Sequence, residues 1–130
     1  MTEASGMNLD ALREHCATLP GATRDIKWGA DEVYSVGAKM FAVFWVEKGR
    51  AQTASFKCET ERFLELTDLP GVVPAPYLAR AHWVQLRQNA HLDDASARAL
   101  VERSHALVLA KLPLKTRRVI LAAANGERTA

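Results

Sequence analysis

Apolar residues recur along the N-terminal part of the chain at helical spacing. Leu9, Leu12 and Cys16 lie at positions i, i+3 and i+7, which is one face of a helix. We predict that this helix spans residues 8–18, because Asn8 has a side chain suited to capping the first backbone N–H groups. The tripeptide Leu-Pro-Gly at 19–21 ends it, since proline disfavours helix in the preceding residue.

The pattern then changes to short runs of β-branched and aromatic residues separated by turns. Residues 32–36, 39–46 and 51–57 are expected strands, joined at Gly37-Ala38 and at residues 48–50. Such a series predicts an antiparallel meander. The middle run is the most apolar, so we expect it to be central and buried on both faces. Strict alternation would place Phe41 and Trp45 on one face of it and Phe44 and Val46 on the other.

Helical spacing returns twice in the second half. We predict a short helix at 60–67, ended by a second Leu-Pro-Gly at 69–71, and a long helix from Asp93 or Asp94 to Lys111. Residues 82–87 alternate as a strand does, whereas two prolines make 72–80 an ordered loop. The order α-β-β-β-α-β-α predicts an α+β fold, with helices packed on one face of an antiparallel sheet.

Length and composition fit one domain with short extensions. The chain has 130 residues, of which 48% are hydrophobic and 25% charged. We expect a disordered tail at 1–7, a single domain at 8–118, and an extension at 119–130 that forms a short helix through 119–122 and then frays. Residues 1–6 do not resemble a signal peptide, and the longest apolar run, Met40 to Val46, is too short for a membrane span. We therefore expect a cytoplasmic monomer without membrane contact.

The charge is nearly balanced overall but unevenly distributed. The net charge of +2 divides into −2 for residues 1–65 (eight basic, ten acidic) and +4 for residues 66–130 (nine basic, five acidic). Four cations fall within eight residues after the long helix: Lys111, Lys115, Arg117 and Arg118. This cluster has two interpretations. It is either a solvated helix end, where cations interact favourably with the helix dipole, or a surface patch that contacts phosphates.

No catalytic or metal-binding motif with the required spacing occurs in the sequence. Cys58 follows Lys57, but neighbours on a strand point to opposite faces, so we expect a buried structural thiol. The two cysteines form no C-x-x-C, and the four histidines are scattered. We therefore expect no enzyme, no cofactor and no metal. An enzyme would need Cys58 or His82 exposed in a cleft beside a partner group.

Five short strings of residues, in this order, resemble one family of small bacterial proteins. They are Leu19-Pro20-Gly21-Ala22-Thr23 with Asp25; Val36-Gly37-Ala38-Lys39-Met40-Phe41-Ala42; Lys57-Cys58; Tyr77 with Arg80, His82 and Trp83; and Ser104 with Leu107-Val108 and Lys111-Leu112-Pro113. Together they are similar to the MmcQ/YjbR family over residues 8–118. The sequence departs from the family pattern at Ala38, where a second glycine is frequent, and at Leu114, which interrupts the basic run.

The resemblance implies a CyaY-like fold and a DNA-binding function through a double-wing arrangement of β-hairpins. On that view the DNA-contacting candidates are Lys39, Lys57, Arg80, His82, Lys111, Lys115, Arg117 and Arg118. The same fold resembles frataxin, but the first helix lacks the acidic ridge that iron binding there relies on.

A second hypothesis is an interaction or small-ligand module at the edge of the sheet. Tyr77, Arg80, His82 and Trp83 would line its pocket. A tryptophan flanked by basic groups is suited to stacking on a base, although packing of Trp83 in the core is the more common arrangement.

Overall fold

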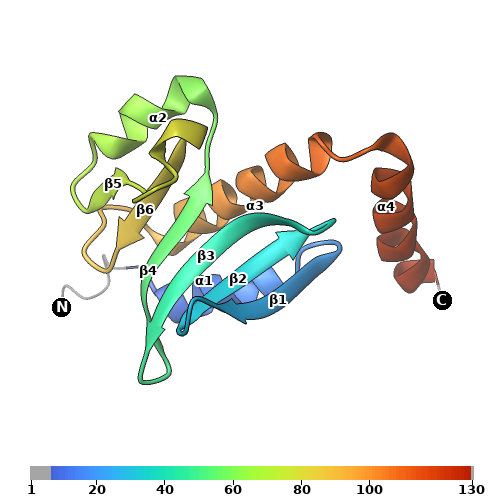
Figure 1. Ribbon diagram of the computed structural model, residues 1–130, viewed down its shortest axis with the longest axis horizontal. Helices are drawn as coiled ribbons and strands as arrows, with labels where there is room; N and C mark the ends of the chain where they lie inside the picture. Colours follow the sequence, from blue (N-terminus) through green and yellow to red (C-terminus); the bar gives the residue numbers. More distant parts are fainter. Residues whose placement is uncertain (1–6, 130) are drawn as a thin grey trace.

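The computed structural model describes residues 7–129, which form six strands and four α-helices (Figure 1). The helices are α1 (Leu9–Ala17), α2 (Thr60–Thr67), α3 (Asp94–Ala110) and α4 (Leu114–Thr129), with a 3-10 turn, η2, at Ala79–Ala81. The strands are β1 (Ala22–Lys27), β2 (Asp31–Val36), β3 (Lys39–Glu47), β4 (Arg50–Lys57), β5 (Val72–Pro74) and β6 (Trp83–Arg87).

All six strands form one antiparallel sheet in the order β1-β2-β3-β4-β6-β5. The predicted α+β class and the predicted order of the main elements are confirmed. The structure adds two edge strands: β1, and β5 where a loop was expected, so the loop prediction for residues 72–74 is wrong. Pro74 is accommodated because an edge strand has one side without ladder hydrogen bonds.

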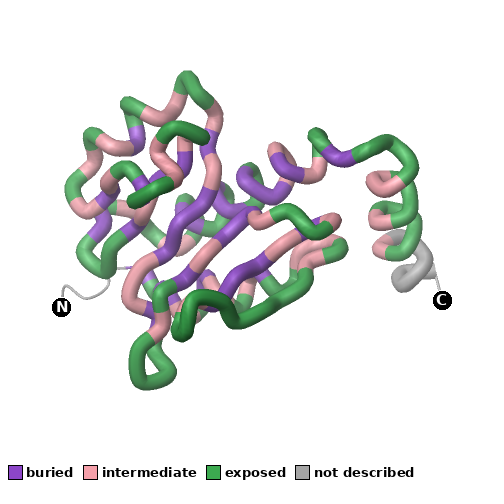
Figure 2. The backbone as a smooth tube through the Cα atoms, viewed as in Figure 1, coloured by how far each residue is buried: buried purple, intermediate pink, exposed green. Residues whose placement is uncertain are grey.

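Helices α1, α2 and α3 cover one face of the sheet, whereas α4 stands apart from it (Figure 1). Helices α1 and α3 run behind β2, β3 and β4 in Figure 1 and contact these strands, while α2 packs on β5 and β6. Figure 2 shows the buried residues concentrated along the central strands and the inner side of α3. As predicted, Leu9, Leu12 and Cys16 are the buried face of α1, whose first turn is capped by the Asn8 side chain.

Strand β3 is central, as expected, but only its helix-facing side is buried. The register between β2 and β3 shifts after Tyr34. Tyr34 pairs with Ala42, whereas Ser35, the next residue of β2, pairs with Met40, so Phe41 has no partner on β2. Phe41 is therefore the extra residue of a bulge. Its ring packs edge-on against the imidazole of His105 in α3, with 5.1 Å between the two ring centroids. The expectation that Phe41 shares a face with Trp45 is wrong, because the bulge interrupts the alternation.

The two ends of the chain also differ from expectation. Met7 is buried against the core, so the expected tail does not include it, and residues 1–6 lie outside the described part. Pro113 begins α4 as well as ending α3, since its carbonyl accepts the N–H of Arg117. Helix α4 is much longer than the short helix expected at 119–122, and partly buried Ile120 packs it against the core.

Candidate functional site

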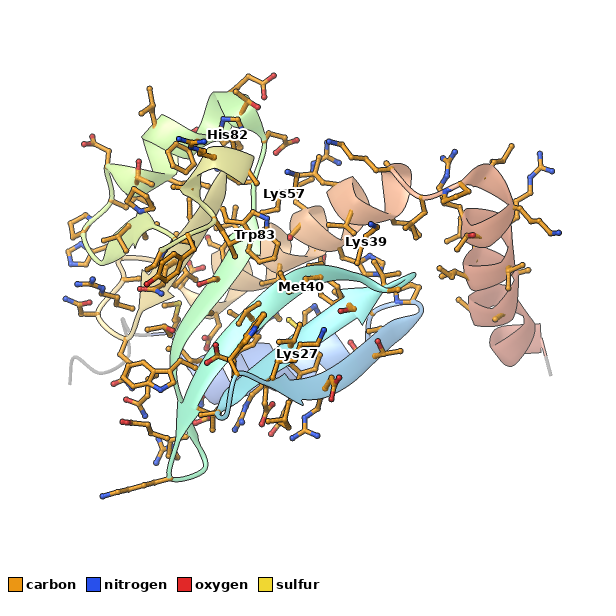
Figure 3. All side chains as sticks on the ribbon, in the orientation of Figure 1. Lys27, Lys39, Met40, Lys57, His82 and Trp83 are labelled. Atoms are coloured by element: carbon orange, nitrogen blue, oxygen red, sulfur yellow. The ribbon has the colours of Figure 1, made fainter. Side chains whose placement is uncertain are left out.

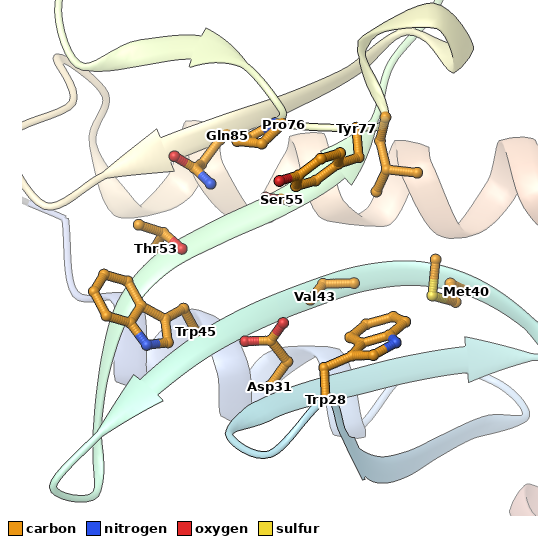
Figure 4. Close-up of a pocket in the computed structure, with 11 residues that line it drawn as sticks. Trp28, Asp31, Met40, Val43, Trp45, Thr53, Ser55, Pro76, Tyr77 and Gln85 are labelled. Carbon is orange, nitrogen blue, oxygen red and sulfur yellow. The ribbon is translucent and has the colours of Figure 1, made fainter.

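The face of the sheet opposite α1 and α3 carries a groove of about 620 Å³, which we call the sheet groove (Figure 4). Its apolar lining consists of Trp28, Met40, Val43, Trp45, Pro76, Tyr77 and Leu78. Its polar lining consists of Asp31, Thr53, Ser55 and Gln85. A volume of this size matches the concave sites that bind small organic molecules.

Three large aromatic residues of the sheet groove are exposed to solvent. Trp28 is 67% exposed, Trp45 44% and Tyr77 103%. Trp28 lies in the β1–β2 turn, Trp45 on β3, and Tyr77 in the connection between β5 and η2, so three separate segments bring them to one face. Large apolar side chains gathered in a groove of a soluble domain are a common feature of binding sites.

Two of these aromatic residues have left-handed backbone conformations. Trp28 has φ of 53° and Tyr77 has φ of 68°. Residues other than glycine, asparagine and aspartate rarely adopt this backbone region, because their Cβ atom comes too close to the following carbonyl oxygen. Ala38 and Lys48 adopt the same region in the other two hairpin turns, outside the groove, so the conformation of Trp28 is that of its turn. Tyr77 lies in no hairpin turn, and strain of its kind is found at ligand sites.

Strand register positions the polar residues of the sheet groove. Asp31 pairs with Trp45 across β2 and β3, Trp45 pairs with Thr53 across β3 and β4, and Ser55 pairs with Gln85 across β4 and β6. Paired residues share a face, so these polar groups lie across the middle of the sheet. Burial raises the pKa of the Asp31 carboxyl above its usual range.

Several of the basic candidates lie at one end of the sheet (Figure 3). Lys57, at the end of β4, donates a hydrogen bond from Nζ to the carbonyl of Ala81 at 2.9 Å, which places it beside Arg80 and His82. Partial burial and the nearby charge of Lys111 lower the pKa of Lys57. Lys39 lies at the start of β3, next to the β2–β3 turn that packs on the α3–α4 connection.

The remaining basic candidates lie on α4. Lys115 and Arg118 are exposed there, whereas Arg117 donates a hydrogen bond from Nε to the carbonyl of Leu112 at 3.1 Å. Arg117 thus stabilises the α3–α4 connection. Among the described side chains, none of the eight basic candidates belongs to an ion pair.

The residues of the second hypothesis are only partly brought together. Tyr77 lines the sheet groove, but Arg80, His82 and Trp83 do not. Trp83 is 5% exposed and belongs to the buried core. His82 is half-buried. Its ring packs edge-on against that of Phe63, with 5.5 Å between the ring centroids, and its Nδ1 lies 3.4 Å from the hydroxyl oxygen of Thr60.

The two cysteines are free and buried. Burial raises the pKa of the Cys58 thiol and raises that of Cys16 to about 12, which keeps both protonated at neutral pH. Among the side chains that the structure describes, no three from histidine, cysteine or acidic residues gather where they would hold a metal ion. No helix in the described part of the chain has the length and apolar character needed to cross a membrane.

Sequence reasoning missed most of the sheet groove. Trp45 was expected in the core, and Trp28 and Asp31 were not singled out, because β1 was not predicted. One signal was available: Trp28 is followed by Gly29 and surrounded by charged residues, a setting typical of an exposed turn.

The fold is that of a small α+β domain, with helices on one face of its sheet and a groove lined by exposed aromatic side chains on the other. The chain belongs to the YjbR family, whose model matches residues 17–107. Among curated proteins, none shows a significant match to the chain.

Two solved structures are similar in fold. A Deinococcus radiodurans protein, DR2400, with a DUF419 domain, aligns with a TM-score of 0.76 at 23% identity, covering 88% of each chain. A Pseudomonas syringae protein aligns with a TM-score of 0.63 at 19% identity, covering 78% of this chain and 99% of its own. At these identities the similarity demonstrates a shared fold.

Proposed function

We propose that this protein is a non-catalytic binding module whose sheet groove takes a small organic molecule. One observation carries the proposal: Trp28, Trp45 and Tyr77 are exposed around a single groove of about 620 Å³. Covering such side chains removes apolar surface from water, at roughly 25 cal/mol per Å². A ligand with an apolar or aromatic body would obtain its affinity from this term.

The strained backbone at Tyr77 supports the same proposal. Tyr77 keeps a left-handed conformation although its side chain is fully exposed. A glycine at this position would be more stable in the free protein. The aromatic ring therefore has a role outside the core, and contact with a ligand supplies one.

The surroundings of the two candidate nucleophiles or bases support a non-catalytic role. Cys58 is buried with a raised pKa, and the ring of His82 packs against Phe63 and has Nδ1 within hydrogen-bond distance of Thr60. Neither residue lines the sheet groove. We accordingly assign the groove to binding alone.

A thermal-shift screen against neutral, cationic and anionic metabolites tests the proposal. A ligand present at a hundred times its Kd stabilises the folded state by about 2.7 kcal/mol, so a hit raises the melting temperature measurably. The hit should lose its effect in Trp45→Ala and keep it in Leu64→Ala, which removes an exposed apolar side chain from α2, outside the groove. A hit unaffected by Trp45→Ala, or the absence of any hit, would contradict the proposal.

We propose a second function, weak binding of DNA through phosphates, at the end of the sheet that carries Lys57. The specific observation is that Lys57 and Lys111 repel each other, while no carboxylate pairs with either within the described residues. A phosphate would relieve this repulsion. Four further cations are exposed: Lys39 at the start of β3, Arg80 in η2, and Lys115 and Arg118 on α4.

Fluorescence anisotropy with a labelled duplex tests DNA binding. We expect binding at low salt that weakens as salt rises, because phosphate contacts release counterions. Replacing Lys57 and Lys111 by alanine should weaken it severalfold, whereas Lys48→Ala, in the exposed β3–β4 turn, should not. Binding whose affinity is unchanged when Lys57 and Lys111 are replaced, or no binding at low salt, would refute this second function.

A further inference from the structure

A carboxylate lies among the exposed aromatic side chains of the sheet groove. Figure 4 shows Asp31 between Trp28 and Trp45, with Tyr77 across the groove. Asp31 is the first residue of β2 and pairs with Trp45 of β3, which fixes its side chain on the open face. It is the one acidic residue among those that line the groove.

No protein cation neutralises this carboxylate in the described part of the chain. Lys27 pairs with Asp31 across β1 and β2, but the two side chains are not within ion-pair distance. Lys27 is exposed, and burial is the cause that raises the pKa of Asp31. A partly buried carboxylate without an ion-pair partner favours a ligand that supplies the missing positive charge.

The aromatic rings act in the same direction. The faces of tryptophan and tyrosine rings carry partial negative charge and attract cations, tryptophan most strongly. Two tryptophans and a tyrosine around one carboxylate form a set suited to an ammonium group, above all an alkylated one. The same set disfavours phosphates and carboxylates, because Asp31 would repel them.

We propose that the ligand of the sheet groove is an organic cation, an amine or quaternary ammonium joined to an apolar body. Its nitrogen lies against Asp31, Trp28 and Trp45, and its body extends along the groove toward Met40. This inference rests on the proposed function and names the chemical class that the groove selects.

Matched probes of one shape test the charge preference. Calorimetric titration would compare benzyltrimethylammonium with its neutral carbon isostere, neopentylbenzene, on the full chain. We expect the cation to bind about tenfold more tightly. The variant Asp31→Asn should reduce that preference severalfold, to the part that the aromatic rings supply, and leave the affinity for the neutral probe unchanged, which also demonstrates that the variant is folded.

A control substitution separates a local effect from the overall charge. Glu47→Gln removes the same charge from the end of β3, outside the groove, and should preserve the tenfold preference. Equal affinity for both probes in the unaltered protein, or a preference that Asp31→Asn leaves undiminished, would overturn the inference while leaving the groove a binding site. Failure of both probes to bind would overturn the inference and count against the proposed function too.

Discussion

The hydroxyl of Ser104 connects α3 to the backbones of two central strands, β3 and β4. Its side chain is fully buried, donates a hydrogen bond to the carbonyl of Phe41 at 2.7 Å, and accepts one from the N–H of Lys57 at 3.0 Å. The bulge at Phe41 takes this carbonyl out of the regular ladder, so the serine of α3 satisfies it.

Replacing Ser104 by alanine should lower the free energy of unfolding by about 2 kcal/mol, because two buried backbone groups lose their partner. Chemical denaturation measures the loss. Hydrogen exchange locates it: the amide of Lys57 should exchange faster, while that of Ala54 in the same strand is unchanged. A loss below about 0.5 kcal/mol would mean that water replaces the hydroxyl.

The left-handed conformation of Tyr77 makes a second prediction at this scale. Its side chain is fully exposed, so removing the ring loses little packing. Tyr77→Gly should be more stable than Tyr77→Ala by about 1 kcal/mol, since only glycine adopts a φ of 68° without strain. Thermal denaturation of the two variants checks the order, and a more stable alanine variant would indicate that the conformation is not strained.

At the scale of elements, the same tripeptide precedes both edge strands. Leu-Pro-Gly at 19–21 connects α1 to β1, and Leu-Pro-Gly at 69–71 connects α2 to β5. Gly21 and Gly71 both have positive φ, of 70° and 81°, which turns the chain from the helix into the sheet. The repeated stop signal of the sequence therefore also marks where an edge strand begins.

Gly71 is the more constrained of the two glycines. A Cβ atom there would lie 2.4 Å from Cα of Ala90, a backbone atom that cannot move aside. Gly71→Ala should cost more than about 3 kcal/mol of stability, through this clash and the left-handed strain together. Gly49→Ala is the matched control: its φ is 78°, but nothing lies within 4 Å, so it should cost about 1 kcal/mol. Equal losses in denaturation would refute the clash.

The sequence predicted the main elements because each has a strong local pattern. Helix α1 has its cap and apolar spacing, and α3 begins at Asp93, whose side chain accepts the N–H of Ser96 as an N-cap does. The edge strands were not predicted because they bury few residues. Five of the six residues of β1 are exposed, so its sequence shows no alternation of apolar and polar residues.

The candidate site was harder to predict because it depends on tertiary structure. Trp28, Asp31, Trp45 and Tyr77 come from three segments, and only the strand order brings them together. The bulge at Phe41 moved one aromatic ring to the core, while Trp45 remained on the open face. Residue type alone does not distinguish these two outcomes.

At the scale of the whole molecule, one charge network connects α1 to the sheet. Buried Glu32 of β2 accepts hydrogen bonds from Arg13 of α1 at 2.8 Å, from Arg24 of β1 at 3.1 Å and from Tyr34 at 3.1 Å. Asp10 of α1 pairs with Arg13 and accepts the N–H of Ala51 in β4 at 2.9 Å. The helix is thereby fixed over three strands.

This network should make the fold sensitive to acid. The hydrogen bond from Arg24, with the charge of Arg13, holds the pKa of Glu32 below its usual 4.5. Burial alone would raise the pKa of Asp10, but its bonds to Ala51 and Arg50 outweigh it and lower the pKa below 3.8. A lowered pKa stabilises the fold above the unfolded value, and this contribution disappears as pH falls through the folded value.

The free energy of unfolding should therefore decline as pH falls below 4.5. Glu32→Gln should be less stable at neutral pH by about 2 kcal/mol and should decline less steeply in acid, because it has lost one of the titrating groups. Urea denaturation at neutral pH and at several values below 4.5 measures both. Parallel curves for the two proteins would show that Glu32 does not drive the acid response.

The burial of both cysteines makes the native protein inert toward thiol reagents. Cys16 is 0% exposed and Cys58 4% exposed, and the chain has no other cysteine. Alkylation of either thiol then requires that α1 or the end of β4 opens, so its rate reports local opening of those two elements. A cysteine introduced at Thr53, on the floor of the sheet groove, would react far faster than both. It would carry a dye into the groove without any need to remove the native thiols.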